Sequence, residues 1–134
     1  MIKELIKTIH FEQGKDCKDY KALKVANPRN VIKVFKSGVD YCIKNKYPTD
    51  DILKKYADKC HGFYYKKQGD VYSDLDIAIF NSDLKLHFKN YEVADVFVRD
   101  SKVKVYAKDH SIVMLTAVGD CEIHTEGNVK VFYR

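Results

Sequence analysis

Several residue types that carry structural or chemical signals are scarce in this sequence. It has no tryptophan, two prolines and six glycines among 134 residues, while 46% of its residues are apolar, and this composition excludes a disordered chain. Its four cysteines, Cys17, Cys42, Cys60 and Cys121, form no CxxC pair, which favours free cytosolic thiols over a disulfide framework. A glycine-rich phosphate loop, a GxSxG turn and an HExxH helix are all missing, so no motif indicates an active site.

Long apolar runs are also missing. The segment MIKELIKTIHFEQ carries Lys3, Glu4 and Lys7 among its apolar residues, so it lacks the unbroken apolar stretch of a signal peptide. No later run approaches the length that crosses a bilayer. We therefore expect a cytoplasmic protein without membrane contact.

The side chains that could support chemistry are scattered. Cys60-His61 is the best local cluster, but a metal site needs at least three protein ligands, and no second cluster accompanies this one. Cys121 and His124 would lie on opposite faces of a strand. We expect no cofactor, no metal and no enzymatic activity. The alternative is a small enzyme that uses Cys17 or Cys60 as a nucleophile.

Charge divides the chain into two unlike halves. Residues 1–67 contain 16 lysines and arginines against 8 acidic residues, whereas residues 68–134 contain 8 against 11. A basic half is typical of proteins that bind nucleic acid or an acidic partner, but these lysines alternate with carboxylates, as on a solvated helix surface. The segment FYYKK at residues 63–67 interleaves aromatic and basic residues, so nucleic-acid binding is an alternative function.

The apolar spacing changes near residue 62. Apolar residues at helical spacing predict a helix over residues 2–11, a short second helix before Pro28, and a helix over 31–43 that is interrupted near Ser37-Gly38. Thr49 predicts the start of another helix. From Phe63 onward, alternating residues predict strands. We expect a helical, basic part over residues 1–62 and a β-repeat part over residues 63–134, packed as one unit.

An internal repeat is the most specific signal. SKVKVYA at residues 101–107 recurs ten residues later as SIVMLTA at 111–117, and turn-forming residues recur near positions 82, 90, 100, 110, 120 and 128. Copies that agree residue by residue favour a β-solenoid, in which each repeat stacks on its neighbour. The predicted fold class is therefore α+β, with N-terminal helices followed by a short β-solenoid. An antiparallel β-sandwich or barrel is the alternative.

The alternation within the strands predicts a second apolar face. If Val103, Val105, Val113, Leu115 and Ile123 point into the core, their neighbours point outward. The outward set then includes the apolar residues Phe97, Ile112, Met114 and Phe132. An apolar outer face implies a cover, either the helical part or a second subunit.

The last rung of the predicted solenoid adds a further interface. Val129 and Val131 would lie at an open end of the stack, where unpaired strands invite partners. We expect a homo-oligomer, with a dimer as the first choice and a trimer as the second.

Three segments resemble a group of uncharacterised small proteins from phages, prophages and mobile elements of gut bacteria. They are FEQGKDC at residues 11–17, NPRNVIKVF at 27–35 and SGVDYCIKNKYP at 37–48, and the repeated strands follow them. The resemblance implies a phage or mobile-element setting, hence the host-cell cytoplasm or the virion, and implies no residue roles. We therefore expect a non-enzymatic binding or assembly protein with a solenoid scaffold, whose basic helical part engages a host or virion protein.

Overall fold

The computed structural model describes residues 31–72 and 74–134. It separates two compact units, Met1–Phe63 and Tyr64–Arg134, and each unit is described here by itself. The helices predicted between residues 2 and 27 lie outside the described residues.

Short helices occupy the described part of the first unit. They are α3 (Val31–Ser37), α4 (Val39–Asn45), α5 (Asp50–Tyr56) and the 3₁₀ helix η1 (Ala57–Lys59). The predicted interruption falls between α3 and α4, where the backbone N–H of Gly38 donates to the carbonyl of Phe35 at 3.1 Å. Thr49 caps α5, as predicted, because its hydroxyl accepts from the backbone N–H of Ile52. Within the described ranges, no helix has both the length and the apolar character needed to span a membrane.

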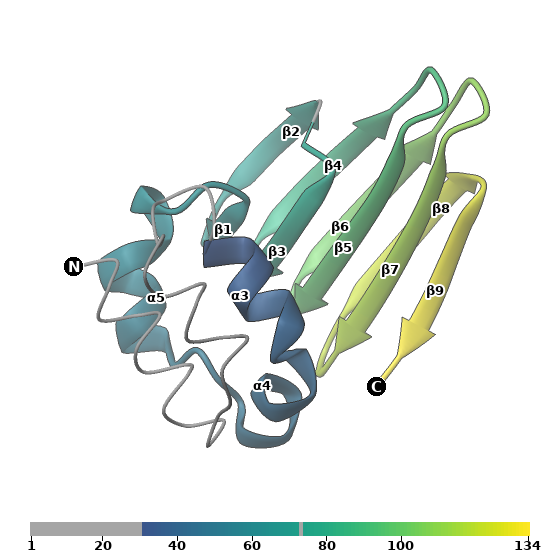
Figure 1. Ribbon diagram of the computed structural model, residues 1–134. Helices are drawn as coiled ribbons and strands as arrows, with labels where there is room; N and C mark the ends of the chain where they lie inside the picture. Colours follow the sequence, from purple (N-terminus) through teal and green to yellow (C-terminus); the bar gives the residue numbers. More distant parts are fainter. Residues whose placement is uncertain (1–30, 73) are drawn as a thin grey trace. The chain divides into compact units, whose positions relative to one another are not determined.

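The strands that follow the helices in the described residues form two parallel sheets. They are β1 (Phe63–Tyr65), β2 (Gln68–Tyr72), β3 (Asp76–Phe80), β4 (Asp83–Phe88), β5 (Val93–Arg99), β6 (Lys102–Ala107), β7 (Ile112–Val118), β8 (Glu122–Gly127) and β9 (Val129–Tyr133). Sheet A has the order β1-β3-β5-β7-β9 and sheet B has the order β2-β4-β6-β8 (Figure 1). Consecutive strands thus alternate between the sheets, and every pairing from β2 to β9 is parallel. The β-solenoid prediction is confirmed, and its antiparallel alternative is wrong.

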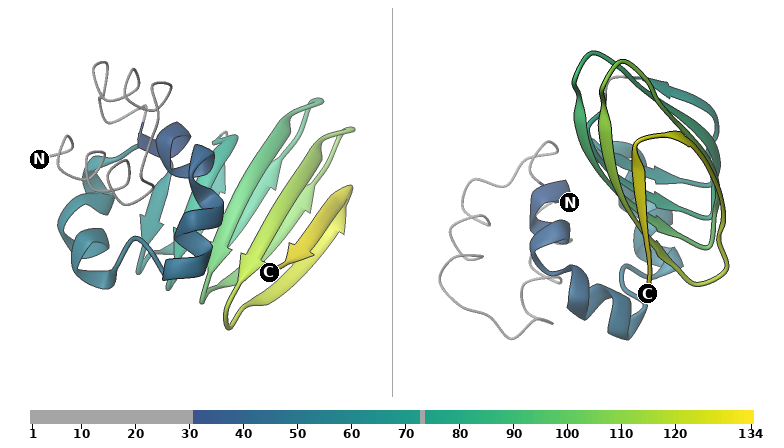
Figure 2. Two further views of the ribbon diagram at one scale, coloured as in Figure 1. Left: turned by 60° about the horizontal axis from the view of Figure 1, so that its bottom comes forward. Right: turned by 90° about the vertical axis from the view of Figure 1, so that its right-hand side faces the viewer.

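A full turn of the solenoid contains two strands, one from each sheet. Leu84 of β4 pairs with Val103 of β6, which in turn pairs with Ile123 of β8, so each of these steps along the chain is one turn. In the right-hand view of Figure 2, the successive turns overlie one another.

The ten-residue repeat is therefore half a turn. Its copies at residues 101–107 and 111–117 lie in β6 and β7, which belong to opposite sheets. The prediction that each repeat stacks on the next copy is wrong. The two copies resemble each other because both strands alternate against the same core and both follow a corner, so each half-turn meets the same physical demands.

The predicted inward register is confirmed. One apolar core between the sheets contains Val103, Val105, Val113 and Leu115, each with 0% exposure, and Ile123 packs partly buried against it. The core also takes the alternate residues of the neighbouring strands, among them Ile77, Ile79, Leu84, Leu86, Val96 and Val98.

Two kinds of corner join the sheets. At one, buried serine hydroxyls stack: the Ser101 hydroxyl accepts from the backbone N–H of Ser82 at 3.0 Å and donates to the carbonyl of Arg99 at 2.9 Å. At the other, two consecutive residues take positive φ, as in Asn90-Tyr91 and Asp109-His110. Asparagine and aspartate at the first of these positions tolerate the left-handed region better than most side chains.

Candidate functional site

The outer face of sheet A carries an apolar strip. Ile112 and Met114 of β7 are 41% and 38% exposed, and Phe132 of β9 is 42% exposed. Val93 of β5, which pairs with Ile112, is 62% exposed. We call these four residues the apolar strip. Three of them belong to the predicted interface, and the alternation of the strands brings them to one face.

Opposite charges flank the middle of this strip. Asp95 of β5 and Lys130 of β9 both pair with Met114, so the three side chains form one row across the sheet. The Lys130 ammonium group lies 5.9 Å from the ring centroid of Phe132. The row therefore runs from a carboxylate through a thioether to an ammonium group.

The other predicted interface residues are buried or half-buried. Phe97 is only 2% exposed, and its ring centroid is 5.7 Å from that of Phe80 on the neighbouring strand. Val129 and Val131 of β9 are half-buried and pack against the core, in register with Val113 and Leu115. Among the predicted interface residues, Ile112, Met114 and Phe132 are thus the ones that combine large exposure with the outer face.

The outer face of sheet B is polar and carries a stack of three rings. The ring centroids of Tyr72 and His87 are 4.6 Å apart, with an interplanar angle of 11°. Those of His87 and Tyr106 are 5.2 Å apart, with an interplanar angle of 17°. The rings come from the neighbouring strands β2, β4 and β6. His87 Nε2 also forms a 2.8 Å hydrogen bond with Asp70 Oδ1.

Sequence reasoning missed this stack because it compared segments half a turn apart. His87 and Tyr106 are separated by a full turn and pair in the β4–β6 register. Aligning the chain at the full-turn period superposes DLKLHFK (83–89) on KVKVYAK (102–108), and this comparison would have revealed the stack.

Two hollows border the ring stack on sheet B. One, of about 160 Å³, is lined by Tyr72, His87, Phe88, Lys89, Glu92, Tyr106 and Lys108. The other, of about 410 Å³, is lined by Lys102, Lys104, Val105, Tyr106, His124, Thr125 and Glu126. Tyr106 belongs to both and separates them. A groove of about 590 Å³ follows the serine corner, where acidic and basic side chains of successive turns alternate.

The aromatic residues of the FYYKK segment are engaged in the protein itself. Tyr64 packs against the solenoid core, and its hydroxyl donates to Asp74. Burial and this hydrogen bond raise the pKa of the Tyr64 hydroxyl far above its ordinary value. Within the first unit, Phe63 is buried and packs edge-on against Phe35, with the two ring centroids 5.7 Å apart. Two of the three rings are thus unsuited to stacking on a base.

The described cysteines are free thiols. Burial raises the pKa of the Cys60 thiol from 9.0 to about 11, so very little thiolate is present at neutral pH. Cys42 is 1% exposed, and the Cys121 thiol donates to the carbonyl of Val118 at 3.2 Å. Cys17 lies outside the described residues. Burial therefore disfavours Cys60 as the nucleophile of the alternative enzyme.

Metal-binding side chains do not gather in the part of the chain that the structure describes. Residues 31–72 and 74–134 contain no group of three histidine, cysteine, aspartate or glutamate side chains placed to hold a metal ion. Cys60-His61 thus has no third ligand among these residues.

Comparison with known proteins gives no relative for this chain. No protein-family model, no curated protein and no solved structure matches it. The phage or mobile-element setting therefore stays a prediction from the sequence.

Proposed function

We propose that this protein is a non-enzymatic assembly protein whose solenoid is a rigid scaffold that self-associates through the outer face of sheet A. The apolar strip is the observation that carries the proposal. Its four large side chains are each 38% to 62% exposed, and two of them share the strand β7. Apolar side chains that gather on one face in this way are typical of protein interfaces.

The arrangement of charge favours a second copy of the chain as the occupant. A two-fold axis along β7 would set Met114 of one copy against Met114 of the other. The same operation sets Asp95 of each copy against Lys130 of the other, because these residues lie on opposite sides of Met114 in one row. A two-fold interface requires such self-complementarity, and dimers of this symmetry are the commonest oligomers of soluble proteins.

The interface would be a packing of one sheet on another. Facing sheets pack about 10 Å apart, with the side chains of both inner faces filling the space. Ile112 and Met114 would be most deeply buried, since they lie nearest the axis. Phe132 and Lys130 would close the interface on the β9 side.

Light scattering on the full chain at micromolar concentration tests this function. We expect a mass of twice the 15.6 kDa of one chain, and we expect Met114→Lys to reduce it to one chain. The substitution places a charge from each copy in an apolar interface, which costs several kcal/mol when the charges have no partner.

The control is Leu75→Lys, because Leu75 is 39% exposed, close to the 38% of Met114, but lies before β3 and outside the apolar strip. It should leave the mass of the oligomer unchanged. A wild-type mass of one chain would contradict self-association. Equal loss of mass in both variants would contradict the assignment to this face.

A further inference from the structure

The outer face of sheet B has a second feature that self-association does not explain. On β4 and the residue after it, Lys85, His87 and Lys89 alternate with inward residues. Lys104, Tyr106 and Lys108 do the same on β6 and the residue after it. The register pairs the first two lysines and the two rings. The backbone N–H of Lys108 donates to the carbonyl of Phe88 at 2.9 Å, which continues the ladder to the last two lysines.

Four lysines therefore bracket the stacked pair His87 and Tyr106. We call Lys85, Lys89, Lys104 and Lys108 the lysine quartet. Like charges on directly opposite positions of neighbouring strands repel each other, so this arrangement costs stability by itself. An anion lying across the strands would turn the repulsion into attraction.

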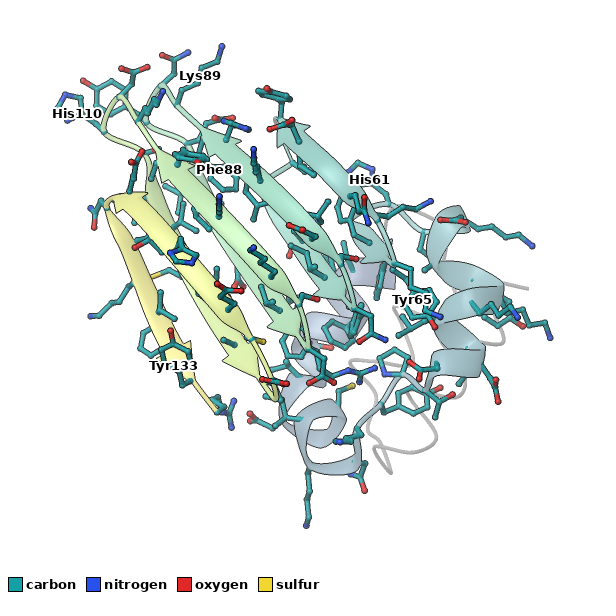
Figure 3. The ribbon with its side chains drawn as sticks, turned by 180° about the vertical axis from the view of Figure 1, so that it is seen from behind. His61, Tyr65, Phe88, Lys89, His110 and Tyr133 are labelled. Atoms are coloured by element: carbon teal, nitrogen blue, oxygen red, sulfur yellow. The ribbon has the colours of Figure 1, made fainter. Side chains whose placement is uncertain are left out.

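Two of the acidic side chains beside the quartet are already bound, and a third, Glu126 of β8, lies beside Tyr106 in the register. Asp70 bonds to His87, and the Glu92 carboxylate accepts from the backbone N–H of Lys89 at 2.8 Å. Across residues 31–72 and 74–134, no carboxylate lies within ion-pair distance of a quartet ammonium group. Their charges thus face outward from a flat, polar sheet. Figure 3 views this face and labels Lys89 where β4 ends.

The ring stack supplies a second kind of contact. Tyr72 ends the stack on β2, which is the edge strand of sheet B, and it is 65% exposed. One face of its ring lies against His87, and no other ring among the described residues 31–72 and 74–134 stacks on β2 at Tyr72, so its second face can extend the stack by one more flat ring. The hollow of about 160 Å³ lies beside this stack, between Tyr72 and Tyr106 and against Lys89 and Lys108.

We propose that the outer face of sheet B binds single-stranded nucleic acid, with phosphates on the lysine quartet and a base stacked on Tyr72. A positively charged surface with aromatic rings is the combination by which proteins hold single strands without reading their sequence. An acidic protein or a sulfated polysaccharide would use the lysines but would not need the open ring. A duplex hides its bases inside and would likewise leave Tyr72 unused.

The test is fluorescence anisotropy of the full-length protein with labelled 15-nucleotide oligo(dT) and oligo(U). Each neutralised phosphate contributes about −0.7 to the slope of log affinity against log salt for single strands, so four lysines predict a slope of about −2.8. Lys85→Gln/Lys104→Gln should halve this slope to about −1.4. Lys54→Gln/Lys55→Gln removes the same charge from α5 and should change neither the slope nor the affinity.

The stacking contact is tested separately. Tyr72→Ala should weaken binding by about 5- to 150-fold, which corresponds to the effect of alanine at other base-stacking aromatic residues, and should leave the salt slope unchanged. Tyr72→Trp should restore the affinity. The control is Tyr91→Ala, because Tyr91 is 74% exposed and also stacks on a histidine, His110 at 5.1 Å, but lies in a turn outside the ring stack.

Three results would overturn the proposal. The first is no saturable binding of either oligonucleotide at about 100 µM protein. The second is an equal loss in the α5 control, which would place binding on the helical unit. The third is heparin, polyglutamate or duplex DNA binding as tightly as the single strands with no effect of Tyr72→Ala, which would make the face a general cation surface. Light scattering on the Lys85→Gln/Lys104→Gln variant measures its oligomer mass. A failure of the nucleic-acid proposal can therefore be distinguished from a failure of the assembly proposal.

Discussion

Replacing Gly127 by alanine should destabilise the solenoid more than the same replacement at Gly69. Both glycines have positive φ, +89° at Gly127 and +123° at Gly69, so an alanine at either position pays a similar backbone strain of about 1 kcal/mol. Their surroundings differ. A Cβ on Gly127 would lie 1.9 Å from the carbonyl oxygen of Ala107, whereas a Cβ on Gly69 would meet no atom within 4 Å.

The clash at Gly127 is with backbone, which cannot rotate away as a side chain can. Gly127 and Ala107 are paired at the end of the β6–β8 ladder, so relief requires the two strands to separate there. Overpacking of this kind costs about 1 to 3 kcal/mol, which brings the total for Gly127→Ala to about 2 to 4 kcal/mol. This is a large share of a typical folding stability of about 5 to 15 kcal/mol.

Urea unfolding followed by circular dichroism measures both free energies. The Gly127→Ala midpoint should fall at least twice as far as the Gly69→Ala midpoint, with equal slopes if both unfold in two states. Equal losses would mean that φ strain alone matters and that the tight contact at Ala107 is absent in solution. No loss in either variant would contradict the solenoid register at β8.

Three further results are expected. Val103→Asp should prevent folding, as judged by circular dichroism, because it buries an unpaired carboxylate at a position whose side chain is 0% exposed. Lys104→Asp on the outer face should fold, and equal tolerance of both substitutions would contradict the inward register. Ser101→Ala should lower the unfolding free energy by about 1 to 3 kcal/mol in urea, because it leaves the buried backbone N–H of Ser82 without its acceptor; an unchanged midpoint would argue against the serine stack. Alkylation of Cys60, followed by mass spectrometry, should stay slow at neutral pH and accelerate only as pH rises toward about 11, since only the thiolate reacts; fast labelling at pH 7 would contradict its burial.

The sequence predicts the inward register because it depends on alternation alone, and it predicts the solenoid because copies of the strands agree residue by residue. Val103 and Leu115 lie between residues that suit the outside, and a parallel stack keeps that alternation in every turn. The length of a turn was harder to predict, because two half-turns that share a core resemble each other as closely as stacked turns do. The residues 101–107 and 111–117 therefore suggested a ten-residue stack, although they lie in opposite sheets.

The two outer faces were predictable to different degrees. Ile112, Met114 and Phe132 were predictable from the sequence, because apolar residues that gather at outward positions of strands indicate a covered or interacting face. The ring stack depends on the pairing of β2, β4 and β6, so it becomes visible only when the register is known. Tyr72 and Tyr106 otherwise look like ordinary strand residues, since aromatic residues are common in strands.

The alternation of consecutive strands between two sheets restricts how such a chain can grow or shrink. An insertion as long as the step from Leu84 to Val103 adds one complete turn and leaves every later side chain on its original face. An insertion of half that length between β6 and β7 adds a single strand, and each later strand then moves to the other sheet. The inward residues would stay inward, so the core would survive such a change, but Met114 would join the sheet that carries the lysine quartet. Viable length variants of this solenoid should therefore differ by whole turns, even though its sequence repeats by halves.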